Sequence, residues 1–287
     1  MFNKAIIIGT GKLPFICGYS LKSYDVSVEI YEYSEYVYSQ LESLCRNTDI
    51  VYRKIDKGGL TNCLLDIDEP LLIVSANNTY IFPKEIVEKE NLLIVNFHPA
   101  LLPKHMGRNA EAWSIYSGDV ETGITWHLVD EKIDHGQILY QAKLHLDDKM
   151  TSLQLMSQQF VMAGEGFKQI ADALVHNKLE KSVYRYDSNI CSMHYAKDVP
   201  NHGKLDVNWS LEEISRFLRA MNYGKMQVLG RPFMEIGKER YIWDRYQIGK
   251  NELSLNNEPN KGIFADNNLS IQLINFRKDE NNEGKIV

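Results

Sequence analysis

The sequence has few cysteines and no long hydrophobic run, and each shortage excludes a class of protein. Its four cysteines, Cys17, Cys45, Cys63 and Cys191, form no C-x-x-C pair and no cysteine/histidine metal spacing. We therefore expect reduced thiols, no disulfide and no structural zinc, as in a cytoplasmic protein. Nowhere do about 20 apolar residues follow one another, as a membrane span requires. The apolar run near residue 5 is too short for a signal peptide, so the sequence predicts a soluble, unprocessed protein.

Excess positive charge is also missing. The 32 basic and 38 acidic side chains give a net charge of -6 at pH 7, which disfavours broad binding to nucleic acid, although a local basic patch would survive this average. The chain of 287 residues is 44% hydrophobic. That length and composition indicate one large domain with a real core and a smaller second domain.

The first part of the sequence has the pattern of an α/β domain. Three short runs are apolar throughout and end in turn residues: "KAIIIGTG" (4–11), "LLIVSA" (71–76) and "NLLIVNF" (91–97). Strands of this kind belong in a mostly parallel sheet that helices cover on both faces. Further strands are expected over 122–130 and 137–146. A long amphipathic helix should follow, opened by a capping box of Thr151 and Gln154.

We predict a doubly wound catalytic domain over residues 1–180, a linker over 181–203 and a small β-rich domain over 204–287. In the last of these, Ser210 and Glu213 form a second capping box ahead of a short amphipathic helix. Short β-like runs separated by Gly and Asn follow it, which is the pattern of a small OB-like barrel. The charged end "RKDENNEGKIV" is expected to fray.

The glycine-rich stretch "GTGKLP" (9–14) follows the first predicted strand. A phosphate-binding turn of a nicotinamide-dependent oxidoreductase would have a third glycine where Pro14 stands, and no P-loop lysine pattern follows. A tight strand-to-helix turn needs glycine whatever the function. The dinucleotide site is therefore the weaker interpretation.

The stretch "NFHPALLPKHMG" (96–107) ends a buried strand, where ligands gather in open α/β sheets. Alone, Asn96 could be a turn cap and His98 a satisfied core histidine. Asp134, however, lies in a loop between two later strands expected in the same sheet. An amide donor, an imidazole and a carboxylate together suit a reaction in which an oxyanion forms and a proton moves.

The two segments that carry these residues, "NFHPALLPKHMG" and "TGITWHLVDEKIDHGQILYQ", resemble the signature of formyltransferases that use 10-formyltetrahydrofolate. The resemblance covers residues 70–150. Farther on, "KLDVNWSLEEISRFLRAMN" and the β-like runs after it are similar to the small barrel domain of methionyl-tRNA formyltransferases and some amino-sugar formyltransferases. The resemblance implies that Asn96, His98 and Asp134 are the catalytic residues and that no metal is required.

The chemistry agrees with these roles. When an amine attacks the formyl carbon, the resulting oxyanion needs donors already in place, and the Asn96 amide and a protonated His98 would supply them. Because a free histidine titrates near ~6.5, we expect the Asp134 carboxylate to favour the charged form of His98 at neutral pH. Asp134 would also orient the ring and help carry the proton from the amine to the folate nitrogen.

The resemblance also implies where the folate co-substrate binds. The stretch "YIFPKEIV" (80–87) and the loop before Asp134 would hold its pterin ring. The cofactor-binding residues implied are Tyr80, Phe82, Ile86 and Leu102, with the backbone of Asp130 and Glu131 at the ring edge. Alternatively, Tyr80 and Phe82 are ordinary core aromatics beside a strand.

Two departures from the family pattern bear on the amine acceptor. Ala100 stands where the family often has serine. The family also has an Arg-Gly pair with a proline shortly after it, whereas here Met106 precedes Gly107 and no proline follows. Because that loop faces the acceptor, these differences argue against initiator methionyl-tRNA, as does the acidic total charge. The residues expected to read a small acceptor are Gly107, Arg108, Asn109 and Trp126, together with His127 and, unless it is helix core, Trp113.

We therefore expect an N-formyltransferase that acts on a small-molecule amine, with a nucleotide-linked amino sugar as the first choice. Amines of the ornithine or hydroxyornithine type and methionyl-tRNA are the alternatives within the family. An oxidoreductase that uses "GTGKLP" and a non-catalytic folate-binding protein are the alternatives outside it. The C-terminal domain is expected to bind the acceptor or to form a homodimer.

Overall fold

The computed structural model describes residues 1–33, 40–179, 190–249, 262–265 and 269–280. Its chain forms two compact units. The first unit comprises residues 1–108, 121–145 and 157–194, and the second comprises 109–120, 146–156 and 195–287. The second unit thus includes two segments that the sequence pattern assigned to the catalytic domain. Residues 181–189, the first part of the predicted linker, and the charged tail after residue 280 lie outside the described residues.

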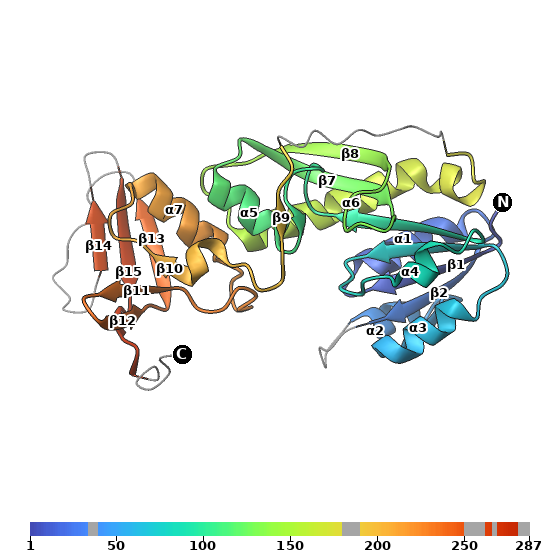
Figure 1. Cartoon of the computed structure of the whole chain (residues 1–287), viewed down its shortest axis with the longest axis horizontal. Coiled ribbons are helices and arrows are strands. Elements are labelled where there is room, and N and C mark those ends of the chain that lie inside the picture. The colour runs from blue at the N-terminus through green and yellow to red at the C-terminus, as the bar shows by residue number, and fades with distance from the viewer. Residues whose placement is uncertain (34–39, 180–189, 250–261, 266–268, 281–287) are drawn as a thin grey trace. The chain divides into compact units, whose positions relative to one another are not determined.

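The first unit is built on a seven-stranded sheet with the order β3-β2-β1-β4-β5-β7-β8 (Figure 1). The strands are β1 (Lys4–Gly9), β2 (Ser27–Glu32), β3 (Val51–Lys54), β4 (Leu71–Ala76), β5 (Leu92–His98), β7 (Glu121–Leu128) and β8 (Ile138–His145). Strands pair in parallel across the sheet from β3 through β2, β1 and β4 to β5, whereas β7 and β8 join this sheet as antiparallel strands. The predicted mostly parallel sheet is confirmed.

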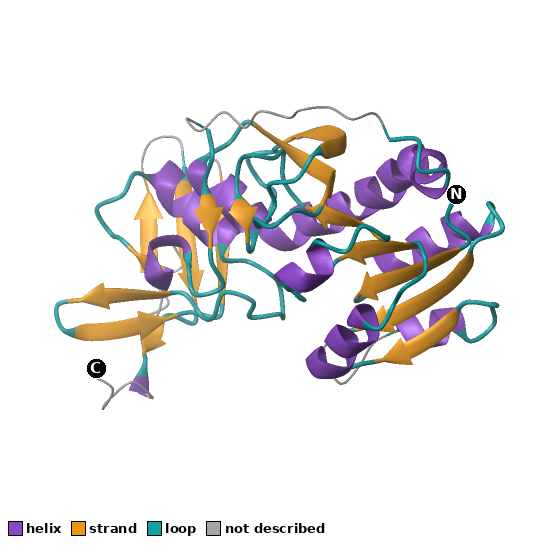
Figure 2. Cartoon of the chain, turned by 45° about the vertical axis from the view of Figure 1, so that its right-hand side comes forward, coloured by secondary structure: helices purple, strands orange, loops and turns teal. Residues whose placement is uncertain are grey.

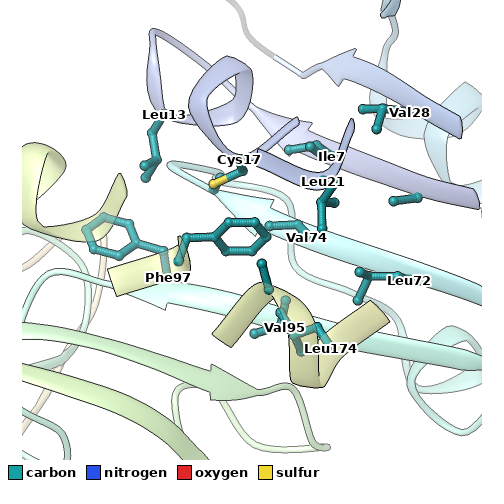
Figure 3. Packing of buried hydrophobic residues seen from close by; sticks show 14 of the residues in the cluster. Ile7, Leu13, Cys17, Leu21, Val28, Leu72, Val74, Val95, Phe97 and Leu174 are labelled. Carbon is teal, nitrogen blue, oxygen red and sulfur yellow. The ribbon is translucent and has the colours of Figure 1, made fainter. Parts of the chain in front are cut away.

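Helices pack on both faces of this sheet (Figure 2), and strands and helices alternate along the first half of the chain. The helices of the first unit are α1 (Leu13–Lys22), α2 (Leu41–Cys45), α3 (Lys57–Leu65), α4 (Lys84–Val87) and most of α6 (Ser152–Val175). Successive residues of β1 face opposite sides: Ile7 packs with α1, α2 and α6, while Ile6 and Ile8 pack with α3 and α4. Figure 3 shows Ile7 among the buried hydrophobic side chains on the side of the sheet that α1 and α6 cover.

This double covering explains why β1, β4 and β5 read as continuous apolar runs. Ile6, Ile7 and Ile8 are at most 1% exposed, and each such side chain gains about 1.5–3 kcal/mol from burial. Gly9 then ends β1 where the chain passes very close to β4, because a Cβ atom there would lie 1.8 Å from the Ala76 carbonyl oxygen. The turn in "GTGKLP" therefore needs glycine for packing.

The second unit combines two helices with two small sheets. Its helices are α5 (Ala110–Ser117) and α7 (Leu211–Ala220), with the 3-10 turn η1 (Pro200–Gly203). One sheet has the order β10-β11-β12-β16 and the other β13-β15-β14. The strands are β10 (Lys204–Leu205), β11 (Phe233–Ile236), β12 (Glu239–Ile242), β13 (Arg245–Gly249), β14 (Gly262–Ala265), β15 (Ser270–Ile274) and β16 (Arg277–Lys278). The predicted OB-like barrel is not confirmed, because the described strands form two separate sheets.

Both predicted capping boxes are present. The Ser210 hydroxyl accepts the Glu213 N–H, and the Glu213 carboxylate accepts the Ser210 N–H, at the start of α7. Thr151 and Gln154 exchange the same two bonds before α6. Among the helices described, none combines the length and hydropathy that a membrane span would need.

Candidate active site

Four polar side chains meet beside the end of β5. Asn96 and His98 lie two residues apart on β5 and therefore face the same side of the sheet. His127 on β7 pairs in register with Asn96. Asp134 comes from the loop between β7 and β8, where its φ angle of 51° places it in the left-handed region that aspartate tolerates better than most residues. The structure thus brings together the three residues that the motifs single out and adds His127.

Asp134 holds His98 from one side and the loop after β5 holds it from the other. Nδ1 of His98 lies 3.3 Å from Oδ2 of Asp134. Nε2 of His98 lies 2.8 Å from the carbonyl oxygen of His105. The same Oδ2 atom accepts the N–H of Gly107 at 2.7 Å. The imidazole therefore has an acceptor at each nitrogen, and its orientation is fixed.

Asn96 and His127 form the other half of the cluster. Nδ1 of His127 lies 2.7 Å from the Leu128 carbonyl oxygen, so it carries a proton. Nε2 of His127 lies 3.1 Å from Nδ2 of Asn96 and 3.4 Å from Oδ1 of Asp134. Nδ2 of Asn96 also donates to Oδ1 of Asp134 at 3.4 Å. The Asn96 amide nitrogen thus lies near both His127 and Asp134, and the contact with Asp134 is the longer one.

Burial and charge set the protonation of this cluster. Burial alone would raise the pKa of Asp134, but the charge of His98, the hydrogen bond and charge of His127 and the Gly107 N–H together lower it to about 2. For His98, burial lowers the pKa below its ordinary value, and the Asp134 carboxylate offsets this only in part. The expectation that Asp134 keeps His98 charged at neutral pH is therefore wrong, because desolvation of the imidazolium outweighs the attraction of the carboxylate.

Side chains of β7, β8 and α6 hold the loop after β5 in place. The Thr125 hydroxyl donates to the Ala100 carbonyl at 2.6 Å and accepts the Leu102 N–H at 3.2 Å. The Gln141 amide donates to the Leu102 carbonyl at 3.0 Å. The Gln159 amide on α6 donates to the Pro99 carbonyl at 2.6 Å. Because each of these backbone groups has a fixed partner, residues 99–102 form a rigid base for the site.

The residues expected to bind folate divide into two groups. Ile86 is completely buried, and Tyr80 and Leu102 are 5% and 3% exposed. Ile86 therefore belongs to the core under the site, and the expectation that its side chain contacts folate is corrected. Tyr80 also lies in that core and bonds to the Thr61 hydroxyl, as its alternative interpretation states.

The other three residues of that set are accessible. Phe82 is half-buried and packs against the same core cluster as Val129. The Asp130 carboxylate accepts the Lys132 N–H at 2.9 Å and contacts Nδ1 of His135 at 2.7 Å, which shapes the loop before Asp134. Glu131 is exposed and lies 3.6 Å from the Lys84 amine. Asp130 and Glu131 thus lie in the same loop as Asp134, while Phe82 and Val129 border the core beside them.

The residues expected to read the acceptor have different environments. Gly107 lies in the cluster through its bond to Asp134. Arg108 is exposed, and its N–H bonds to the His194 carbonyl at 2.8 Å. Asn109 precedes α5 with a φ of 56°.

Trp126 does not lie at the site. Its side chain is fully buried, packs on Phe97 and Phe167, and donates its ring N–H to the Ala163 carbonyl at 3.0 Å. The expectation that Trp126 contacts the acceptor is therefore corrected. Side chains alternate along a strand, so Trp126 faces the core while its neighbour His127 faces the cluster.

His127 was expected to contact the acceptor, and its place in the catalytic cluster was not predicted from the sequence. One signal points to it: in "ITWHL" the polar residues Thr125 and His127 occupy alternate positions of an otherwise apolar strand. No group of three or more His, Cys, Asp or Glu side chains that could hold a metal ion occurs in the part of the chain that the structure describes.

Comparison with known proteins gives relatives of one kind. The chain is 31% identical over 160 residues to the GDP-perosamine N-formyltransferase of Brucella melitensis, an alignment that covers 53% of this chain and 57% of that protein. It is 40% identical over 101 residues to the methionyl-tRNA formyltransferase of a Synechococcus species, covering 35% of this chain and 30% of that one. The chain thus spans little more than half the length of the first of these relatives and less of the second.

A solved structure has a similar fold over nearly the whole chain. The N-formyltransferase from Helicobacter canadensis, solved in complex with folinic acid and dTDP-3-aminofucose, superposes with a TM-score of 0.72 at 16% identity, covering 97% of this chain and all of that one. A family model described as formyl transferase matches residues 63–169. This range contains both motifs and the whole Asn96, His98, Asp134 and His127 cluster. Residues 63–169 are therefore similar to the formyl transferase family, which confirms the resemblance that the two motifs indicate.

Proposed function

We propose that this protein transfers a formyl group from 10-formyltetrahydrofolate to the amine of a nucleotide-linked amino sugar. The observation that carries the proposal is the contact of His98 with Asp134 at 3.3 Å, beside Asn96, within the residues that are similar to the formyl transferase family. These groups are the amide, imidazole and carboxylate that acyl transfer to an amine requires.

The reaction begins when the amine nitrogen attacks the formyl carbon. A carbon–nitrogen bond forms, and the π electron pair of the carbonyl moves onto its oxygen. Asn96 is the donor for this oxyanion. Its longer hydrogen bond, 3.4 Å to Asp134, is the one that gives way, while the 3.1 Å contact with His127 keeps the amide oriented.

His98 then moves the proton. At neutral pH the buried ring is neutral, and Nε2 holds its hydrogen against the His105 carbonyl, so the lone pair is on Nδ1. Nδ1 takes a proton from the attacking amine, and the resulting imidazolium donates to Asp134. When the tetrahedral intermediate collapses, the bond between the formyl carbon and the folate nitrogen breaks, and that nitrogen receives the proton. The products are an N-formylated acceptor and tetrahydrofolate.

The co-substrate supplies the activated formyl group. Half-buried Phe82 and Val129 offer an apolar wall for a flat ring, and the backbone of Asp130 and Glu131 offers polar groups for its edge. This combination of apolar surface with a few fixed polar groups is typical of small-molecule sites. The residues present therefore fit a pterin.

The acceptor is proposed from the relatives and from one exposed cation. Brucella GDP-perosamine N-formyltransferase is similar in sequence, and the Helicobacter enzyme whose fold is similar was solved with a dTDP-linked amino sugar. Arg108 adjoins Gly107, and its guanidinium is exposed while its backbone N–H is anchored. Arginine suits the diphosphate of a nucleotide-linked sugar, because it binds phosphate oxygens in pairs. We place the enzyme in the cytoplasm, a setting that its four free cysteines fit.

The test is tetrahydrofolate release from 10-formyltetrahydrofolate over a panel of amines: GDP- and dTDP-linked 3-amino and 4-amino sugars, ornithine, hydroxyornithine and methionyl-tRNA. We expect turnover with one of the nucleotide-linked sugars and a product that is heavier by one formyl group. Turnover with ornithine derivatives or methionyl-tRNA alone would refute the acceptor class but keep the reaction. A lack of turnover with every amine would refute the proposed function.

A further inference from the structure

The loop that holds the catalytic cluster is itself held by a distant segment of the chain. Residues 105–108 provide the carbonyl that accepts from His98 and the N–H that binds Asp134. Strand β6 (Met106–Gly107) in this loop pairs in parallel with strand β9 (Met193–His194). Residues 192–194, called here the clamp segment, therefore lie one layer behind the cluster, and nothing in the motifs points to them.

Ser192 fixes the loop at His105. Its hydroxyl oxygen accepts the His105 N–H at 2.8 Å, and its carbonyl accepts the Met106 N–H at 2.8 Å. His105 has a φ of 52°, which is unusual for a residue other than glycine and costs about 1–3 kcal/mol. Such a conformation persists only where its surroundings impose it. Ser192 is therefore part of what keeps the His105 carbonyl directed at His98.

His194 fixes the loop at Gly107. Its carbonyl accepts the Arg108 N–H at 2.8 Å, and a Cβ atom on Gly107 would lie only 2.0 Å from that carbonyl oxygen. Its ring stacks on the ring of His105 with centroids 5.4 Å apart, and Nε2 of His194 lies 3.2 Å from Nδ1 of His105. The two imidazoles thus join the clamp segment to the loop by side chain as well as by backbone.

We propose that Ser192 and His194 are positioning residues of the formyl-transfer site. They set the direction of the His105 carbonyl, which fixes the tautomer of His98. They also set the direction of the Gly107 N–H, which fixes the position of Asp134. The inference rests on the proposed function for its reaction, but its structural content does not. The path is short: one hydrogen bond joins Ser192 to His105, and a second joins His105 to His98. A ring held in one tautomer keeps its lone pair where the amine proton must go.

Kinetic measurements on the full chain test this proposal. Ser192→Ala removes the acceptor of the His105 N–H, and we expect kcat to fall about tenfold, since small misplacements of catalytic groups have effects of this order or more. The KM values for folate and acceptor should stay within about twofold, because a positioning residue acts on the chemical step and not on substrate binding. Ser192→Thr keeps the hydroxyl and should retain most of the activity, and His194→Gln should retain more than His194→Leu. The control is Ile190→Ala, an exposed position two residues before Ser192.

A spectroscopic readout separates this proposal from the proposed function. Histidine side-chain nitrogen NMR on the wild type should show His98 protonated at Nε2, with a slowly exchanging proton bonded to the His105 carbonyl. In Ser192→Ala this proton should exchange faster and the Nδ1 tautomer should appear. If the wild type forms no product, the proposed function fails and the spectrum alone decides the positioning role.

Three results would overturn the proposal. One is a Ser192→Ala protein with the wild-type kcat. Another is an unchanged His98 spectrum in Ser192→Ala. The third is an equal loss of kcat in Ser192→Ala and Ser192→Thr, which would show that the hydroxyl is not what matters.

Discussion

Oδ2 of Asp134 lies 3.3 Å from Nδ1 of His98 and accepts the Gly107 N–H at 2.7 Å. One carboxylate oxygen is thus shared between the imidazole and the backbone of the loop that follows β5. A movement of this loop would therefore change the distance between the Asp134 carboxylate and the His98 ring. The carboxylate therefore couples the shape of the loop to the chemistry of the ring.

Asp134→Asn should reduce kcat by about 10²–10⁴-fold, because an amide cannot stabilise the imidazolium that forms on His98. Folate affinity, measured by fluorescence titration, should change little. Asp172→Asn makes the same chemical change on the exposed surface of α6 and should leave kcat unaltered. Wild-type turnover by the Asp134→Asn protein would refute the assigned role.

The acidic limb of the pH–rate profile should lie below the ordinary titration range of histidine. Burial lowers the pKa of His98, so the ring remains neutral, and able to accept a proton, to a lower pH than a free imidazole. The measurement is kcat/KM as a function of pH, which reports the free enzyme. An acidic limb centred at or above the ordinary histidine value of 6.5 would contradict this expectation.

Asp134 should also stabilise the fold in a pH-dependent way. Its pKa is lowered to about 2 in the folded protein from 3.8, so the unfolded chain binds the proton more readily. The stabilisation, about 2 kcal/mol, is fully present above the unfolded pKa and is lost as the pH falls from about 4 to about 2.

The check is the free energy of unfolding of the wild type minus that of Asp134→Asn, from urea denaturation at several pH values. That difference should shrink by about 2 kcal/mol between pH values of about 5 and about 2. A difference that does not change with pH would show that the Asp134 carboxylate is not favoured in the folded state.

Trp126→Phe should destabilise the protein without affecting the acceptor. The change removes the indole donor of the buried Ala163 carbonyl and opens space between Phe97 and Phe167, at a cost of about 1–3 kcal/mol. The KM for the acceptor should stay the same. A raised KM with unchanged thermal stability would instead place the indole at the acceptor.

Gly107→Ala should be far more damaging than Gly11→Ala. Both glycines have positive φ angles, 92° and 74°, so alanine is strained at each by about 1–2 kcal/mol. Only at Gly107 would the new Cβ atom collide with backbone, 2.0 Å from the His194 carbonyl oxygen, whereas at Gly11 the nearest atom is 3.9 Å away.

Thermal unfolding of both variants measures the difference. We expect Gly107→Ala to cost at least about 3 kcal/mol in total, from strain and overpacking together. Equal destabilisation by the two substitutions would show that the close approach of the loop to residues 192–194 is not maintained in solution.

Much of the first unit could be predicted from its sequence because its signals are local. Strands β1, β4 and β5 are continuous apolar runs, and the helices α6 and α7 begin at capping boxes that need only four residues to recognise. The meeting of Asn96, His98 and Asp134 follows from two motifs at the ends of neighbouring strands. These features do not depend on how distant segments pair.

What the sequence did not reveal depends on register and on burial. The contact of His127 with Asn96 is set by the pairing of β7 with β5, which no local pattern specifies. Trp126 was expected to contact the acceptor, but strand alternation places its side chain in the core, opposite His127. The protonation of His98 depends on a balance between desolvation and the Asp134 carboxylate, and the depth of burial that decides it is a property of the folded chain.

The central claim is that His98 and Asp134 act as one unit on the transferred proton. Its most direct test is the single-turnover rate of formyl transfer in His98→Asn, Asp134→Asn and the double variant. Groups that act together lose most of their effect when either is removed, so the double variant should be little slower than the slower single variant. If the two losses multiply instead, or if either single variant keeps the wild-type rate, the two residues work independently and the account is wrong.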